Sequence, residues 1–121
     1  MIGIPGLGNC KYRLDACQKR ERHGVAVVAY SPFGHNDFPS PHSKEGAVLQ
    51  AIADARRVTP RQIALAFLTR APSVLAIPKA SSAEHAADNA AAGDLTLSAA
   101  EIAALDKAFP RGPKPRGLPM L

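Results

Sequence analysis

Residues 74–84 read Val-Leu-Ala-Ile-Pro-Lys-Ala-Ser-Ser-Ala-Glu, a short apolar run followed directly by the start of a helix. The apolar run lies between Pro72 and Pro78, and this predicts a buried strand over 74–77. Either Ser81 or Ser82 can cap the helix that follows, and Ser81 with Glu84 matches the capping-box spacing. A lysine, two hydroxyls and free helical N–H groups then lie together at the end of a strand. This arrangement is suited to binding phosphate.

A second strand is expected over residues 25–30, Val-Ala-Val-Val-Ala-Tyr. Its unbroken apolar character is typical of a strand that is covered on both faces. The strand ends in Tyr30 and Ser31, and Pro32, Phe33 and Gly34 begin a proline-rich loop. An aromatic ring and a hydroxyl therefore follow the second strand, as the lysine and serines follow the first.

Helices are expected between and around these strands. A helix over 14–23 precedes the strand at 25–30, and one over 43–58 is expected to bury a face made of Ala47, Val48, Ala51, Ile52 and Ala55. Capping boxes at 59–62 and 98–101 begin helices that run to about residues 70 and 109, and a further helix is expected over 83–92. Strands that alternate with helices predict an α/β fold with parallel strands and helical crossovers.

Three segments follow from this pattern. Residues 1–11 form an irregular, glycine-rich leader, residues 12–109 hold the strand–helix units, and residues 110–121 form a proline-rich tail. A closed barrel of parallel strands needs eight of them. The two strands predicted here would form an incomplete barrel with exposed sheet edges, which favours self-association.

The composition excludes several classes of protein. A net charge of +5 and a pI near 9.6 are compatible with nucleic-acid binding, but no aromatic side chains alternate with the basic residues as a base-stacking surface requires. Cys10 and Cys17 lack the partners of a zinc site, and the four histidines show no metal-ligand spacing. No apolar stretch approaches the ~20 residues of a membrane span. We therefore expect a cytoplasmic protein with no metal, nucleic-acid or membrane partner.

The motifs together resemble the last part of the aldo-keto reductase barrel, over residues 14–121. The resemblance rests on four segments, namely 30–34 (Tyr-Ser-Pro-Phe-Gly), 59–65 (Thr-Pro-Arg-Gln-Ile-Ala-Leu), 76–79 (Ala-Ile-Pro-Lys) and 97–102 (Leu-Ser-Ala-Ala-Glu-Ile). It implies the C-terminal portion of a TIM (β/α)8 barrel, with two parallel strands, flanking helices and an NADP(H) cofactor. It also implies that the missing part precedes this segment.

The resemblance assigns roles to particular residues. Lys79 matches the lysine that pairs with the 2′-phosphate of NADP(H), with Ser81 and Ser82 beside it. His85 stands where the family often has an arginine that packs on the adenine and contacts this phosphate. The remaining cofactor-binding candidates are Asp88 and Asn89 at the adenine edge, Tyr30 at the nicotinamide ring, Ser31 and the Phe33 backbone at the pyrophosphate, and Ile77 within the 76–79 motif.

Simpler interpretations exist for most of these residues. A lysine is most often solvated, the serines can be helix caps alone, and Asp88 and Asn89 can belong to a solvated helix face. A tyrosine at a strand end is common. These alternatives stay open at the level of sequence.

No catalytic residue is expected in this chain. In the family, an aspartate, a tyrosine, a lysine and a histidine from the first half of the barrel carry out the proton transfer, and no such motifs occur here. The expected function is therefore that of a truncated aldo-keto reductase that carries the adenosine-phosphate site. Complete relatives reduce aldehydes and ketones, and a small carbonyl substrate is expected only if the barrel is completed. The alternatives are a non-catalytic nucleotide-binding or self-associating module, and a gene remnant.

Overall fold

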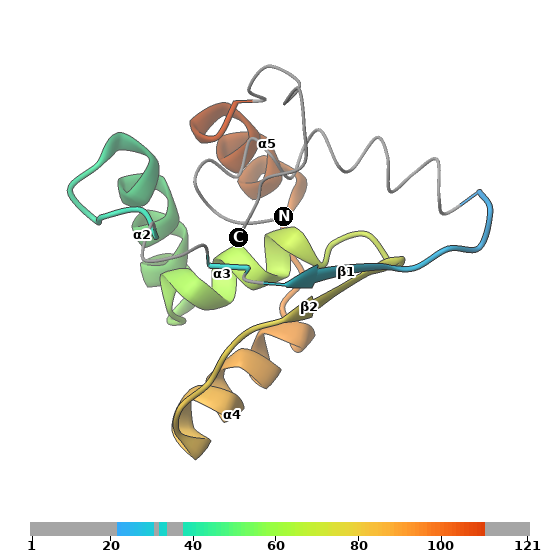
Figure 1. Ribbon diagram of the computed structural model, residues 1–121. Coiled ribbons are helices and arrows are strands. Elements are labelled where there is room, and N and C mark those ends of the chain that lie inside the picture. Colours follow the sequence, from blue (N-terminus) through green and yellow to red (C-terminus); the bar gives the residue numbers. More distant parts are fainter. Residues whose placement is uncertain (1–21, 31, 34–37, 111–121) are drawn as a thin grey trace, which may run out of the picture.

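The computed structural model describes residues 22–30, 32–33 and 38–110 (Figure 1). The elements in chain order are β1 (Val27–Tyr30), α2 (Lys44–Arg56), α3 (Pro60–Leu68), β2 (Val74–Ile77), α4 (Ala83–Ala91), a short 3₁₀ turn η1 (Ala92–Asp94) and α5 (Ala99–Ala108). The predicted leader over 1–11, almost all of the helix predicted over 14–23, and all but residue 110 of the tail lie outside the described residues.

The two strands pair in parallel, as their sequence context predicts. Val27 lies opposite Val74 and Tyr30 lies opposite Ile77. Two crossover helices, α2 and α3, connect the strands. Because parallel strands end at the same edge of a sheet, the loop with Phe33 and the turn with Lys79 leave the sheet on the same side.

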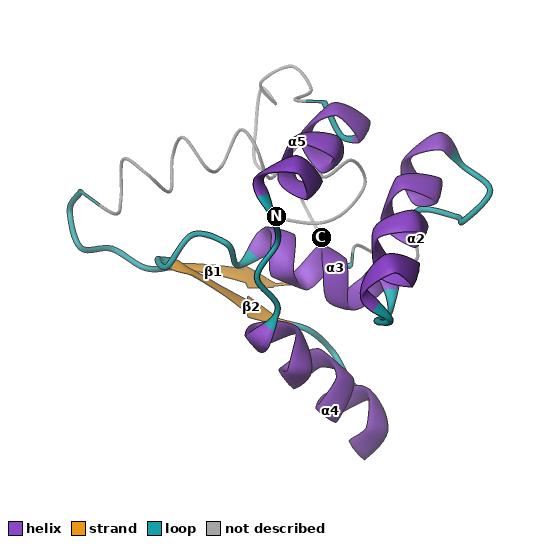
Figure 2. Ribbon diagram, turned by 180° about the vertical axis from the view of Figure 1, so that it is seen from behind, coloured by secondary structure: helices purple, strands orange, loops and turns teal. Residues whose placement is uncertain are grey.

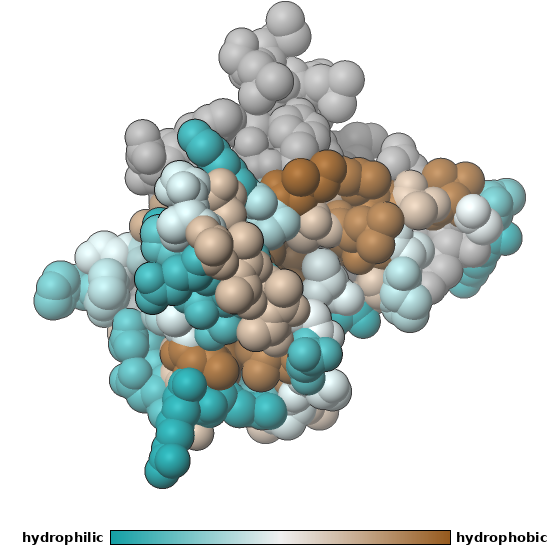
Figure 3. All heavy atoms as spheres, turned by 90° about the horizontal axis from the view of Figure 1, so that it is seen from below, coloured by the Kyte–Doolittle hydropathy of each residue, from teal (hydrophilic) through white to brown (hydrophobic). Residues whose placement is uncertain are grey.

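One face of this sheet is covered and the other is open. Val27, Ala29 and Val74 are buried, whereas Val28 and Leu75 are 49% and 57% exposed and Ile77 is 61% exposed. The expectation that both faces are covered was wrong, because the described helices pack on one side only. Figure 3 shows the resulting patch of hydrophobic side chains over the strands.

Helix α3 is the centre of the molecule. It contacts α2, α4, η1 and β2, and every residue from Gln62 to Leu68 is buried. Figures 1 and 2 show α2 and α5 on one side of α3 and α4 on the other. The largest fully buried side chains include Phe67 and Ile63 of α3, Leu49 of α2 and Leu105 of α5.

The predicted capping boxes at Thr59 and Ser98 are both present. At α4 the cap is Ser82, whose Oγ accepts from the His85 backbone N–H at 3.2 Å, so the box proposed between Ser81 and Glu84 does not form. This cap places the helix start one residue later than a box at Ser81 requires.

The predicted buried face of α2 was wrong except at Ile52. Its buried residues are Gly46, Leu49, Ile52 and Ala53. Ala47, Ala51 and Ala55 are exposed and Val48 is half-buried. The face that was expected consists mostly of alanine, and burying Leu49 and Ile52 removes more apolar area from water than burying alanines.

None of the helices in the described part of the chain has the length and apolar character needed to cross a membrane.

Candidate functional site

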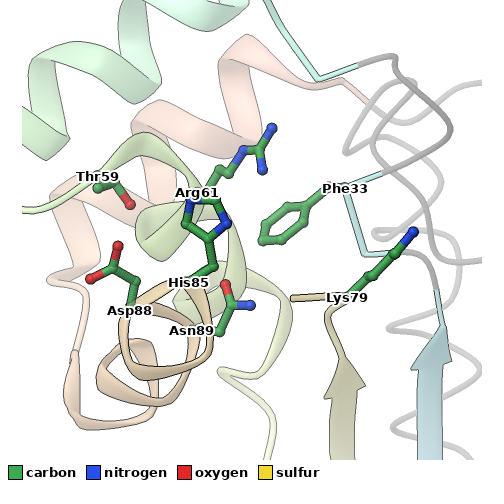
Figure 4. Close-up of a pocket in the computed structure, with 7 residues that line it drawn as sticks. All are labelled: Phe33, Thr59, Arg61, Lys79, His85, Asp88 and Asn89. Carbon is green, nitrogen blue, oxygen red and sulfur yellow. The ribbon is translucent and has the colours of Figure 1, made fainter. Parts of the chain in front are cut away.

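A cleft of about 360 Å³ opens where β2 ends and the first turns of α3 and α4 approach each other (Figure 4). Seven residues line it: Phe33, Thr59, Arg61, Lys79, His85, Asp88 and Asn89. They come from both strand ends and from two helices, so the cleft exists only in the folded chain.

The α4 side of the cleft follows from helical spacing. His85, Asp88 and Asn89 are three and four residues apart, which places them on one face of the helix. Asp88 and Asn89 are half-buried, and His85 is exposed. The helix begins at the cleft because the cap at Ser82 fixes its first turn directly after the strand.

The α3 side is formed by the capping box at its start. The Thr59 Oγ accepts from the Gln62 N–H at 3.2 Å, and the Gln62 Oε1 accepts from the Thr59 N–H at 2.9 Å. The Gln62 side chain also donates through Nε2 to the Asp88 carbonyl at 2.9 Å. This bond joins the two walls of the cleft. Because Gln62 is buried, water has little access to the bond and does not readily take its place.

Arg61 lies over two aromatic rings. Its guanidinium carbon is 5.3 Å from the centroid of Phe33 and 5.6 Å from that of Phe38. The two rings meet edge to face, with centroids 5.9 Å apart. Figure 4 shows the Phe33 ring pointing toward Arg61 and His85, while the Lys79 ammonium extends away from them.

The cleft combines positive charge with groups that recognise a base. Lys79 and Arg61 carry positive charges, His85 offers a flat aromatic ring, and Asp88 and Asn89 offer an acceptor and an amide. Such a set fits an anionic ligand that also carries a planar, hydrogen-bonding ring. Among the described residues, no group of three or more His, Cys, Asp or Glu side chains could hold a metal ion.

The structure brings together five of the residues predicted from the sequence, namely Phe33, Lys79, His85, Asp88 and Asn89. Ser81 and Ser82 are exposed and do not line the cleft, and Ile77 points from the open sheet face. Tyr30 ends β1, but its side chain lies outside the described part of the structure, as does Ser31.

Thr59 and Arg61 line the cleft but were not among the predicted site residues. The sequence does carry a signal for them, because the capping box at 59–62 marks the start of a helix and both residues lie at that start. It does not say which strand end that helix start will face. Packing of α3 against α4 settles this question.

Comparisons with known proteins agree with this fold. Residues 13–109 match the model of the aldo/keto reductase family. The methylglyoxal reductase YeaE of Escherichia coli is 37% identical over 97 residues, which are 80% of this chain and 33% of that protein. Pyridoxine 4-dehydrogenase of the same organism is 38% identical over 84 residues, 69% of this chain and 28% of that protein. The chain thus spans about a third of the length of these relatives.

Solved structures give the same result. An aldo-keto reductase from Klebsiella pneumoniae in complex with NADPH is similar, with a TM-score of 0.70 and 39% identity over 89% of this chain and 37% of that one. The thermostable aldo-keto reductase Tm1743, in complex with the inhibitor epalrestat, has a TM-score of 0.68 and 37% identity over 76% of this chain and 32% of that one. The two strands and their helices therefore correspond to part of a TIM barrel.

Proposed function

This chain belongs to the aldo/keto reductase family, and we propose that its cleft binds the adenosine 2′-phosphate end of NADP(H). The observation that carries the proposal is the meeting of Lys79, His85, Asp88 and Asn89 in one cleft beside the end of β2. The Klebsiella structure with bound NADPH supports the choice of cofactor.

The residues of the cleft suit the parts of this ligand. The Lys79 ammonium follows the strand end and provides a charge-assisted contact for a phosphate oxygen. His85 offers a ring against which an adenine can stack, and the Asp88 carboxylate can accept from the exocyclic amino group of adenine. The Asn89 amide offers both a donor and an acceptor to the base edge.

Turnover needs more than this cleft. A bound NADPH supplies the hydride, while a carbonyl substrate requires a proton donor and a pocket that holds it against the nicotinamide ring. We propose that in a complete barrel the chain's own contribution is to bind and orient the cofactor, and that the substrate is a small aldehyde or ketone. We expect the 121-residue chain alone to show no NADPH-dependent reduction of aldehydes.

Replacing Lys79 tests the cofactor assignment. Lys79→Ala should weaken binding of NADPH by about 1.5–3 kcal/mol, the range for a hydrogen bond to a charged group, and should leave NADH nearly unchanged. Titration calorimetry with both cofactors measures this difference. Lys107→Ala removes an exposed lysine from the last turn of α5 and should change neither affinity. Equal losses for NADPH and NADH would remove Lys79 from the 2′-phosphate role.

A second function is favoured by the open face of the sheet. The exposed side chains of Val28, Leu75 and Ile77 support a module that associates with another copy of this chain or with a separate barrel segment. This function does not exclude nucleotide binding, because the cleft lies beyond the ends of the strands.

A further inference from the structure

Arg61 is an exposed cation on the wall of the cleft that has no acidic partner in the described part of the chain. The ion pair found there joins Arg56 to Glu101, and none of the hydrogen bonds described involves the Arg61 guanidinium. The guanidinium lies over the rings of Phe33 and Phe38. A charge held in place without a counterion can bind an anion without first breaking an ion pair.

The position of Arg61 is unfavourable for the stability of the helix. It lies in the first turn of α3, which carries no acidic residue, and a cation at this end of a helix opposes the helix dipole. The α2, α4 and α5 helices instead have Glu45, Glu84 and Glu101 in their first turns. The contacts with the rings of Phe33 and Phe38 hold the guanidinium in place but do not neutralise its charge, which an anion in the adjoining cleft would do.

The contacts of Arg61 also indicate which part of a ligand it meets. The guanidinium carbon lies over two aromatic rings, and within the described residues its N–H groups have no acceptor, so these groups remain for a ligand. An N–H edge suits phosphate oxygens, which it can contact in a bidentate manner.

We propose that Arg61 binds the 2′-phosphate as a second cation, reaching it from the α3 side of the cleft while Lys79 reaches it from the end of β2, and thereby determines a preference for NADP over NAD. The inference rests on the proposed function of the cleft. A phosphate monoester carries a charge of about −1.5 to −2 at neutral pH, which two full cations balance. Lys79 is one of these cations, and Asp88 in the same cleft opposes the phosphate, so Arg61 supplies the second.

The test compares 2′,5′-ADP with 5′-AMP by titration calorimetry on the full 121-residue chain. Arg61→Gln keeps a hydrogen-bonding side chain but removes the charge. It should weaken the binding of 2′,5′-ADP by about tenfold or more, equivalent to ~1.4 kcal/mol. Binding of 5′-AMP should not change. Arg61→Lys should retain part of the preference, and Lys107→Gln should retain all of it.

A second replacement tests whether the guanidinium itself is what matters. In the Arg61→Gln background, His85→Arg returns a guanidinium to the cleft from α4, and should restore most of the lost affinity for 2′,5′-ADP. In the unaltered chain the same replacement should add little, because the phosphate already has its second cation.

The outcomes separate this inference from the proposed function. If the unaltered chain binds neither nucleotide, both are overturned. If it prefers 2′,5′-ADP and Lys79→Ala removes the preference while Arg61→Gln does not, only the role of Arg61 is overturned. The role of Arg61 would also be overturned if Arg61→Gln weakened the binding of both nucleotides equally and left the thermal melt unchanged. The residue would then act on the adenosine that the two nucleotides share.

Discussion

Gly46 has a packing role that the local sequence does not indicate. It lies in the first turn of α2, where the chain before the helix folds back on it. A Cβ at this position would be 1.9 Å from the Ser40 carbonyl oxygen. Ser43 fixes the turn, since its N–H and Oγ donate to the same carbonyl at 2.9 and 2.8 Å. The absence of a side chain at residue 46 is therefore a packing requirement.

Gly46→Ala should destabilise the protein, although alanine is the better helix former by about 1 kcal/mol. The clash is with backbone, which cannot move aside as a flexible side chain can, so we expect a net loss of about 1–3 kcal/mol. Denaturant unfolding measures it. The matched control is Gly93→Ala, because nothing lies within 4 Å of a Cβ at Gly93. An unchanged or higher stability for Gly46→Ala would show that the turn is not packed as described.

At the scale of elements, one ion pair joins α2 to α5. The Arg56 Nε donates to Glu101 Oε1 at 2.8 Å and its Nη2 donates to Oε2 at 2.5 Å. These hydrogen bonds from Arg56, together with one from the Ser98 backbone N–H at 2.7 Å, lower the pKa of Glu101 from 4.5 to about 2. Glu101 therefore completes the capping box of α5 and also forms the ion pair that connects α5 to α2.

The lowered pKa of Glu101 predicts a pH dependence of stability. A carboxylate with a lower pKa in the folded state stabilises the fold above its unfolded pKa, and this stabilisation is lost as pH falls from about 4.5 to about 2. Glu101→Gln keeps a capping-box side chain but removes the titrating group, so the variant should be less stable at pH 7 and show a flatter decline over this range. Thermal melts from pH 7 to pH 2 measure the effect.

Glu84→Gln is the control for this experiment, because Glu84 is an exposed acid in the first turn of α4. It should leave the steepness of the acid transition nearly as it is in the unaltered protein. The interpretation of Glu101 would be contradicted if both variants changed the transition equally.

Gln62 connects two elements with one side chain. Its Oε1 completes the capping box of α3, and its Nε2 donates to the Asp88 carbonyl of α4. Gln62→Glu retains the first bond and removes the second, since a carboxylate cannot donate. We expect a loss of about 1–3 kcal/mol in unfolding free energy, as for a buried acceptor left without its donor.

Denaturant unfolding of Gln62→Glu should be compared with that of Gln50→Glu. Gln50 donates to Asp54 at 2.8 Å on the exposed side of α2, and loss of an exposed pair of this kind costs about 0.5 kcal/mol or less. Similar costs for the two replacements would mean that burial of the Gln62 bond contributes little.

At the scale of the whole molecule, the open sheet face dominates the behaviour we expect. Val28, Leu75 and Ile77 are about half exposed or more, and each strand has one partner within the described residues. A bare apolar face with open strand edges favours pairing with further strands. In the TIM barrel of aldo/keto reductases, further strands pair with such strands and close the barrel.

The isolated chain should therefore associate with itself, and Leu75→Lys should reduce this association. The charge would lie in the centre of the exposed face, where an apolar partner cannot solvate it. Sedimentation velocity at several concentrations measures the effect. Ala104→Lys places the same charge on the exposed side of α5 and should leave association unchanged. A monomer at every concentration of the unaltered chain would contradict this prediction.

Much of the local structure could be predicted from the sequence, because its signals are short in range. The capping boxes at Thr59 and Ser98 place two helix starts correctly, and prolines on either side of 74–77 mark the second strand. The alternation of strands and helices predicts their parallel pairing. Helical spacing also places His85, Asp88 and Asn89 on one face, so the α4 wall of the cleft follows from local rules.

Only the tertiary structure decided how these elements meet. It placed Arg61 in the cleft, directed Gln62 to the Asp88 carbonyl, and buried Leu49 rather than the alanine face of α2. It also left one face of the sheet open. These features depend on contacts between residues far apart in the chain. The free energy of such a contact arises when both partners are buried together. Caps and periodicity arise within a few residues, and for that reason the sequence by itself determines them.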